Sequence, residues 1–201
     1  KLISRLVLST DDDEIARVAG EYGAEVPFER PAELAEDHVL DLPVCQHCLR
    51  WLDENENYRP DIVVHLRPTA PMRTAAHIDQ CVEILIASPE TDSVRTVCTA
   101  PVHPLKMWRL DDDELVPFVP ETVYEISEPY NRPRQSLPSA YVQNGSVDVV
   151  RTEVILGGSM SGTRVKGVVM EGSESVNIDS HTDWAVAELE MRNRVNSAAG
   201  D

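Results

Sequence analysis

The chain of 201 residues is long enough for one domain with a full hydrophobic core. Its 35 acidic residues outnumber the 18 basic ones and give a net charge of −17 at pH 7. Such a field repels nucleic acid polymers and anionic membranes, which argues against both as partners, although a few arginines in a cleft can still bind a small anion. No apolar run approaches the ~18 residues needed to cross a bilayer, and no signal peptide is visible.

The four cysteines do not form a disulfide framework in a chain of this length, which favours a reducing cytoplasm. Cys45 and Cys48 form a C-x-x-C pair, but they fall on the apolar face of a predicted helix and lack the second ligand pair of a zinc site. We therefore interpret both as core residues. The sequence also lacks the G-x-S-x-G, P-loop and G-x-G-x-x-G motifs.

The first half of the chain alternates apolar runs with helical periods. Strands are predicted at residues 5–9, 24–28, 61–66 and 93–100. Helices are predicted after N-caps at Asp11–Asp13, Asp41 and Thr74, and the best apolar face comprises Ile78, Cys81, Val82, Leu85 and Ile86. This alternation favours a three-layer α/β/α fold, in which a mostly parallel sheet carries helices on both faces.

The second half of the chain does not continue the alternation of strands and helices. Residues 107–119 predict an antiparallel hairpin that turns at Asp111–Asp113, and residues 120–140 are rich in proline and have no period. We interpret residues 102–141 as an arm inserted into the domain. Strands are then predicted at 141–150 and 163–170, followed by a helix that Ser180 caps and that runs to about Arg194, and the tail 196–201 is expected to fray.

Two loops place arginines where an anionic ligand could bind. Arg67, Thr69 and Arg73 follow a buried strand, at the edge of the sheet where open α/β folds bind ligands. The rigidity of a proline-rich loop explains these residues equally well. Arg132 and Arg134 lie in a second loop stiffened by prolines, which would keep their guanidinium groups oriented, although a solvated loop is the usual reason for such charges.

A third loop carries Asn177 and Asp179 between a predicted strand and the last helix. A carboxylate there can cap the helix or bind Mg²⁺ through waters. Because Ser180 is available as the cap, Asp179 is left for a metal ion. The acidic runs 11–13 and 111–113 are better interpreted as a helix cap and a hairpin turn.

Four segments together give the chain a family resemblance. They are STDDDEIARVAGEYGAEVPFERPAELAED (9–37), LRPTAPMRTAAHID (66–79), RPRQSLPSAYVQNGSVDVV (132–150) and SVNIDSHTDWAVAE (175–188). In this order they resemble the acylneuraminate cytidylyltransferases, the CMP-sialic acid synthetase family. The resemblance implies a Rossmann-like nucleotidyltransferase fold with a protruding β arm. It also implies transfer of CMP from CTP to the anomeric hydroxyl of an acidic nine-carbon sugar (a nonulosonic acid), with release of pyrophosphate and a requirement for Mg²⁺.

The resemblance assigns roles to single residues. Arg134 would pair with the sugar carboxylate and Asp179 would hold Mg²⁺, and both are candidate catalytic residues. The expected substrate-binding residues are Arg30 at the CTP phosphates or ribose, Arg67 and Thr69 on the sugar side, Asn144 in the same pocket, and Arg73, Gln135 and Lys106. Lys106 would lie on the arm, which is expected to join two chains into a homodimer.

The sequence departs from the family pattern at several positions. Relatives begin with a strand and a phosphate-binding Arg-x-Gly-Ser-Lys loop, which nothing here matches, so residues 1–201 are expected to form one cytidylyltransferase domain without that segment and to be nearly inactive if Lys1 is the true start. Many relatives have Gln at Arg67, Asp at Asn177 and an aromatic residue at Asp148.

Two alternatives stay open. The first is a non-catalytic module that binds nucleotide sugars on the same fold. The second is a nucleotidyltransferase for a phosphosugar, which would not need Arg134. Sialic, legionaminic and pseudaminic acids are all candidate sugars.

Overall fold

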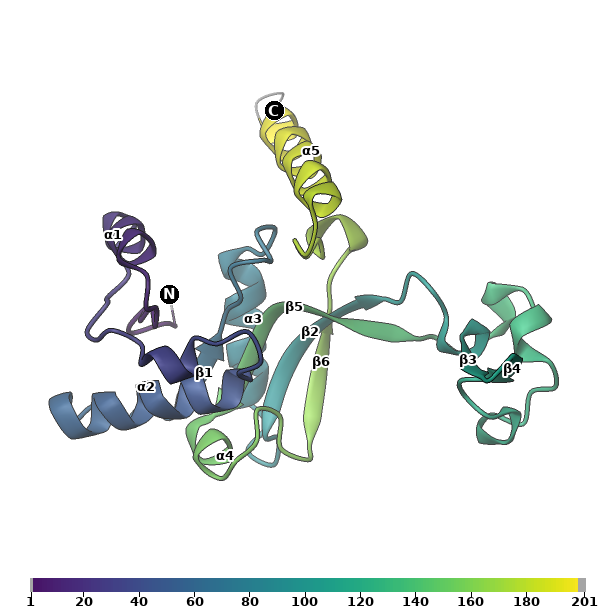
Figure 1. Cartoon of the computed structure of the whole chain (residues 1–201), viewed down its shortest axis with the longest axis horizontal. Coiled ribbons are helices and arrows are strands. Elements are labelled where there is room, and N and C mark those ends of the chain that lie inside the picture. The colour runs from purple at the N-terminus through teal and green to yellow at the C-terminus, as the bar shows by residue number, and fades with distance from the viewer. Residues whose placement is uncertain (1, 199–201) are drawn as a thin grey trace. The chain divides into compact units, whose positions relative to one another are not determined.

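The structure is a computed structural model, and it describes residues 2–198 (Figure 1). The chain divides into two compact units. The first unit comprises residues 1–68, 73–95 and 147–168, and the second comprises residues 69–72, 96–146 and 169–201. In the part of the chain that the structure describes, no helix is long and apolar enough to cross a membrane.

Four strands form the main sheet, in the order β1–β5–β2–β6 (Figure 1). They are β1 (Ile62–His65), β2 (Ser93–Thr99), β5 (Tyr141–Arg151) and β6 (Val165–Val169). Strands β1 and β5 are antiparallel, with Val64 opposite Val149 and His65 opposite Asp148, so the sheet is mixed. Predicted strands 5–9 and 24–28 are reduced to a single parallel bridge, Val7 to Glu25, which is too short to form a ladder.

Three helices of the first unit cover the two faces of its strands: α2 (Asp41–Glu56), α3 (Ala75–Ile86) and the short α4 (Thr152–Leu156). Helix α1 (Asp13–Glu21) has no buried residue and belongs to neither core cluster. On one face, Cys81, Val82 and Leu85 of α3 pack with valines of β2, β5 and β6. On the other face, Leu49 of α2 and Ile155 of α4 pack with Val150 of β5. This arrangement within the first unit is the α/β/α layering that the sequence predicts.

The ends of the helices show which of the predicted capping residues cap a helix. The Asp12 carboxylate accepts from the amide of Ile15 at 2.8 Å and caps α1, and Thr74 caps α3 as expected. The prediction of Asp41 as a cap is wrong: Leu40 is the N-cap, and Asp41 is the first residue of α2. Its carboxylate binds Arg67 instead. Ile86 is also misassigned to the buried face of α3, because it is 58% exposed at the last turn.

The second unit contains the predicted hairpin, β3 (Trp108–Asp111) and β4 (Glu114–Pro117). Its strands pair antiparallel, and Asp112 takes the left-handed conformation in the turn. Short 3₁₀ turns fill the segment without period: Glu121–Val123, Pro129–Asn131 and Arg134–Ser136. Helix α5 runs from His181 to Ala198, four residues beyond the predicted end. Residues 199–201 of the tail that was expected to fray lie outside the described residues.

Candidate functional site

The predicted site residues are distributed over both units. Arg30, Arg67 and Arg73 belong to the first unit. The second unit contains Thr69, Lys106, Arg134, Gln135, Asn144 and Asp179. The two groups of candidate residues therefore belong to separate units of the chain.

Arg67 lies just past the carboxyl end of β1, where it is held between two carboxylates. Its Nη2 donates to Asp41 Oδ2 at 2.6 Å, and its Nη1 donates to Asp148 Oδ2 at 3.1 Å. Burial works against the charge of Arg67, but these two carboxylates raise the pKa of its guanidinium group above the ordinary value. The arginine that the sequence assigns to an anionic ligand thus already has two anionic partners.

Asp148 connects Arg67 to a second arginine. Its Oδ1 lies 3.2 Å from Arg95 Nε, and its side chain is only 5% exposed. Because a buried carboxylate is costly unless it is paired, the two arginines account for its presence among the buried valines of β5. Arg73 adds a further contact by donating to the backbone carbonyl of Arg67 at 2.6 Å. We refer to Arg67, Asp148, Arg95 and Asp41 as the β1 ion cluster.

Sequence reasoning missed Asp41, Arg95 and Asp148 as parts of this cluster. A signal existed for Asp148, because a lone carboxylate interrupts the valine run of β5 and side chains alternate along a strand. Val147 and Val149 face α3, so Asp148 must face the side of α2, where a buried charge requires a partner. No signal in the sequence points to Arg95 or Asp41 as that partner.

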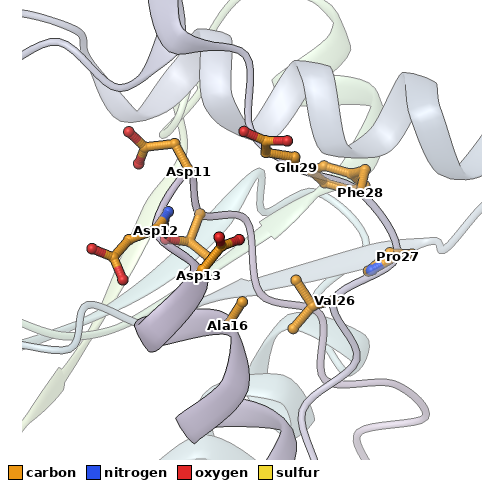
Figure 2. Close-up of a pocket in the computed structure, with 9 residues that line it drawn as sticks. Asp11, Asp12, Asp13, Ala16, Val26, Pro27, Phe28 and Glu29 are labelled. Carbon is orange, nitrogen blue, oxygen red and sulfur yellow. Dashed lines mark hydrogen bonds between the residues drawn. The ribbon is translucent and has the colours of Figure 1, made fainter.

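Arg30 makes contacts with the segment that precedes α1. Its Nε donates to the Ser9 hydroxyl at 3.1 Å, and its Nη2 donates to the Ser9 carbonyl. A nearby pocket is lined by Thr10, Asp11, Asp12, Asp13, Ala16, Val26, Pro27, Phe28 and Glu29 (Figure 2). The four carboxylates of this pocket make it unsuited to phosphate groups on its own. The role of Arg30 toward CTP stays a prediction.

In the second unit, Asp179 occupies an exposed position directly before α5. Its Oδ2 accepts from Asn177 Nδ2 at 2.7 Å. Ser180 and Asp183 form the helix cap: the Ser180 hydroxyl accepts from the amide of Asp183 at 3.3 Å and donates to its carboxylate at 2.7 Å. These contacts hold the pKa of Asp183 below its ordinary value. The side chain of Asp179 therefore does not cap the helix, as the sequence predicts.

The same loop offers oxygen atoms to a metal ion. Asn177 Oδ1 is buried and has no hydrogen-bond partner, next to the exposed carboxylate of Asp179. In residues 2–198, no three His, Cys, Asp or Glu side chains gather as they would in an all-protein metal cage. Mg²⁺ needs no such cage, since it is held by one or two carboxylates together with waters and substrate phosphates. The oxygens present fit Mg²⁺ and do not fit zinc.

Asn144 is buried among polar partners of the second unit. Its Oδ1 accepts from the Thr96 hydroxyl at 2.7 Å and from the Ser146 amide at 3.2 Å. Its Nδ2 donates to the Ser175 hydroxyl at 3.0 Å and contacts Met170 Sδ at 3.3 Å. An asparagine side chain has two donors and two acceptor sites, so these contacts use its full capacity. Asn144 thus connects several segments of the second unit through hydrogen bonds. Its contact with a sugar stays a prediction.

Of the remaining candidates, Arg134, Gln135 and Lys106 lie on the arm and Thr69 lies in the loop after β1. Arg134 is exposed and donates to the carbonyls of Ala100 and Pro101, the latter at 3.1 Å, while Gln135 beside it is exposed. The Lys106 ammonium group donates to the carbonyls of Tyr130 at 3.0 Å and Arg132 at 2.6 Å. Thr69 accepts from the amide of Ile178 through its own carbonyl at 2.8 Å, which ties the loop after β1 to the Asp179 loop.

The C-x-x-C pair is partly buried on the packed side of α2, which agrees with the interpretation from the sequence. Cys45 packs against the cluster of Leu49, Val150 and Ile155. Burial raises the pKa of Cys45 to about 12 and that of Cys48 to about 11, so both are thiols at pH 7. A protonated thiol is a poor nucleophile and a poor metal ligand.

The fold defines the class of protein. The structure resembles CMP:2-keto-3-deoxy-manno-octonic acid synthetase complexed with CTP, with a TM-score of 0.63 at 10% identity over 96% of this chain and 82% of that chain. It also resembles 4-diphosphocytidyl-2C-methyl-D-erythritol synthase from Anaerococcus prevotii, with a TM-score of 0.59 at 14% identity over 94% of this chain and 79% of that chain. The predicted Rossmann-like nucleotidyltransferase fold is confirmed.

Sequence comparison identifies the family. The chain is 32% identical to a CMP-N,N'-diacetyllegionaminic acid synthase of Campylobacter jejuni over 94% of its length and 77% of the relative's. It is 28% identical to post-translational flagellin modification protein B of Campylobacter coli over 96% of its length and 80% of the relative's. No family model matches the sequence. The chain belongs to the acylneuraminate cytidylyltransferase family and is a nucleotidyltransferase enzyme.

Proposed function

We propose that the protein transfers CMP from CTP to the anomeric hydroxyl of a nonulosonic acid and releases pyrophosphate. The observation that carries this proposal is the 32% identity with a CMP-N,N'-diacetyllegionaminic acid synthase over nearly the whole chain. A legionaminate-type sugar is therefore the first candidate substrate, with N-acetylneuraminate and pseudaminate next. The free cysteines Cys45, Cys48, Cys81 and Cys98 suit a reducing compartment, and we place the enzyme in the cytoplasm.

In this mechanism the chain's own residues supply orientation and charge. Arg134, on a short turn after Pro133, would bind the sugar carboxylate with its guanidinium fork and fix the sugar for in-line attack on the α-phosphorus. Arg30 would approach the CTP phosphates or ribose. Fixed cations placed where the leaving pyrophosphate gains charge lower the barrier without rearrangement.

Asp179 would hold Mg²⁺, with the Asn177 side-chain oxygen available as a second ligand. When bound, Mg²⁺ neutralises phosphate charge and lowers the pKa of a coordinated hydroxyl. The Asn177 amide keeps the Asp179 carboxylate in place through its 2.7 Å hydrogen bond, while Ser180 and Asp183 hold the start of α5. The carboxylate is thus positioned before any ligand arrives.

The test is a screen for pyrophosphate release with CTP, Mg²⁺ and a panel of sugars. The panel contains N,N'-diacetyllegionaminate, N-acetylneuraminate, a pseudaminate and one phosphosugar. We expect release with at least one nonulosonic acid and none with the phosphosugar, and none when CTP is replaced by ATP. Release with the phosphosugar alone, or binding of a CMP-sugar without any turnover on the panel, would contradict the proposal.

A further inference from the structure

The segment Thr69–Met72 follows β1 in the chain but belongs to the second unit. Ala70 is fully buried and Met72 is 1% exposed, so their side chains fix the segment within that unit. The Thr69 carbonyl accepts from the amide of Ile178 at 2.8 Å. We refer to residues 175–180, which surround Ile178 and carry the candidate metal ligands, as the metal loop. The segment Thr69–Met72 thus supports the middle of the metal loop.

The side chain of Arg194 connects this support to the start of the metal loop. Its Nη1 donates to the Met72 carbonyl at 2.9 Å, and its Nη2 donates to Glu174 Oε1 at 3.2 Å. Glu174 ends the short turn Gly172–Glu174, from which the chain enters the metal loop. Arg194 itself belongs to α5, which begins directly after that loop. One guanidinium group therefore joins both sequence flanks of the metal loop to the segment that supports it.

An arginine suits this position because its two acceptors lie in different segments. The guanidinium group presents its N–H donors in a rigid planar fork, so two nitrogens can hold two acceptors at a fixed separation. A lysine has a single ammonium group on a flexible stem and cannot fix that separation. Arg194 is 33% exposed and Glu174 is 28% exposed, so water only partly screens the pair, unlike an ion pair on the open surface.

The metal loop needs a fixed geometry more than an ordinary loop does. Mg²⁺ demands a near-ideal octahedral arrangement of oxygens and tolerates little displacement of its ligands. Asn177 Oδ1 is buried without a hydrogen-bond partner, and the Asn177 amide nitrogen Nδ2 donates to Asp179 Oδ2 at 2.7 Å. Because Ile178 lies between these two residues, a shift of its backbone moves both candidate ligands at once.

We propose that Arg194 is a positioning residue for the metal ion. By joining Glu174 to the Met72 carbonyl, it keeps the Ile178 amide on the Thr69 carbonyl and so holds the oxygens of the metal loop in place for Mg²⁺. This inference rests on the proposed function. Arg194 acts through the backbone of the loop, so its loss should weaken metal binding while saturating metal restores most of the maximal rate.

The test combines metal binding with a direct measurement on the loop. Arg194→Gln is the main variant, because it removes the charge and the fork from a half-buried position. Arg192→Gln is the matched control on the same helix, where Arg192 lies 3.5 Å from Glu188 in an exposed ion pair. Electron paramagnetic resonance gives the dissociation constant of Mn²⁺, a probe for Mg²⁺, in the presence of CTP. Hydrogen exchange followed by NMR gives the protection of the Ile178 amide without any ligand, and pyrophosphate release gives the Mg²⁺ dependence of the rate.

For Arg194→Gln we expect the Mn²⁺ dissociation constant to rise at least fivefold and the Ile178 amide to exchange at least tenfold faster. The Mg²⁺ concentration for half-maximal rate should rise with the dissociation constant, and kcat at saturating Mg²⁺ should fall less than threefold. Glu174→Gln, which removes one of the two acceptor charges, should show the same pattern more weakly, and Arg192→Gln should change each quantity less than twofold. In the Asp179→Asn background, Arg194→Gln should weaken Mn²⁺ binding no further.

Unchanged protection of Ile178 or unchanged Mn²⁺ affinity in Arg194→Gln would overturn the inference. An equal effect of Arg192→Gln, or faster exchange of Val149 in β5 by the same factor as Ile178, would also overturn it, because the change would then be a general loss of stability. A wild-type Mn²⁺ affinity that does not depend on Asp179 would refute the metal assignment in the proposed function and the inference with it. An affinity that depends on Asp179 but not on Arg194 would refute the inference alone.

Discussion

The side-chain amide of Asn144 donates to the hydroxyl of Ser175 at 3.0 Å, and this contact joins β5 to the loop that carries Asn177 and Asp179. The Ser175 hydroxyl in turn donates to the Glu171 carbonyl at 2.8 Å. Farther along the same unit, Arg194 of α5 donates to the Met72 carbonyl at 2.9 Å and pairs with Glu174 at 3.2 Å. The candidate metal loop is thus held by polar contacts from both of its flanks.

Asn144→Ala should destabilise the fold as well as the loop. The change removes the hydrogen bond that the buried Thr96 hydroxyl donates to Asn144, and a hydrogen bond of this kind contributes about 0.5–1.5 kcal/mol. Urea unfolding should show a fall of that size in the free energy of unfolding, whereas Asn131→Ala on the exposed arm should change little. An unchanged stability with lost sugar binding would show that Asn144 serves the ligand alone.

Asp179→Asn should abolish turnover and leave the thermal midpoint nearly unchanged, because the Asp179 side chain is exposed and only its backbone amide, which the substitution keeps, contacts the cap residue Asp183. Asp183→Asn is the informative companion, since it removes the cap acceptor of α5 and should lower the midpoint. Pyrophosphate release and calorimetric unfolding separate the two effects. Turnover near the wild-type level in Asp179→Asn would exclude this residue as the metal ligand.

Arg134→Lys keeps the charge and loses the guanidinium fork. A bidentate charged pair contributes roughly 1.5–3 kcal/mol, so the apparent affinity for the sugar should fall at least tenfold while that for CTP barely moves. Initial rates over a grid of both substrates give the two constants. Equal losses for both substrates would assign Arg134 a structural role, through its contacts with the carbonyls of Ala100 and Pro101.

Local signals predicted much of this fold. The caps at Asp12 and Thr74 and the hairpin turn at Asp112 need only neighbours within a few residues, and each is where the sequence places it. The β1 ion cluster could not be predicted in this way. Arg67 and Asp148 are 81 residues apart, and their pairing depends on the antiparallel register of β1 and β5. The prediction that Asp41 caps α2 is wrong for the same reason: its ion-pair partner Arg67 is distant in sequence.

Stability should fall in acid partly through Asp92. Its carboxylate accepts from the amides of Arg164 at 2.9 Å and Thr163 at 2.7 Å, and these contacts lower its pKa. A carboxylate with a lowered pKa in the folded state stabilises the fold above its ordinary pKa of about 4, and this contribution is lost as the pH falls through the lowered value. Asp92→Asn should therefore flatten the decline in thermal midpoint between about pH 5 and pH 2, and an unchanged slope would assign the decline to other groups.

The arm is expected to join two chains into a homodimer. Leu110 and Leu115 face each other across the hairpin and are 66% and 62% exposed, and Phe118 just beyond it is 64% exposed. A two-stranded hairpin cannot bury such groups by itself. A second copy of the same surface would bury them, and twofold pairing is the commonest arrangement of identical chains. Trp108 already packs on Tyr130 of its own arm, with ring centroids 4.4 Å apart, so it is a poorer reporter of the interface than Leu115 or Phe118.

Light scattering at low and high salt tests this dimer. Each chain carries −17, so two chains bring −34 together, and the interface must be mainly apolar to overcome that repulsion. An apolar interface persists at high salt, where screening also weakens the repulsion between the chains. We expect a dimer mass under both conditions and a monomer mass for Leu115→Glu combined with Phe118→Glu. Glu121→Gln, on the arm but away from the hairpin, should leave the dimer intact. A monomer mass for the wild-type chain at both salt concentrations would mean that the hairpin is exposed for another reason.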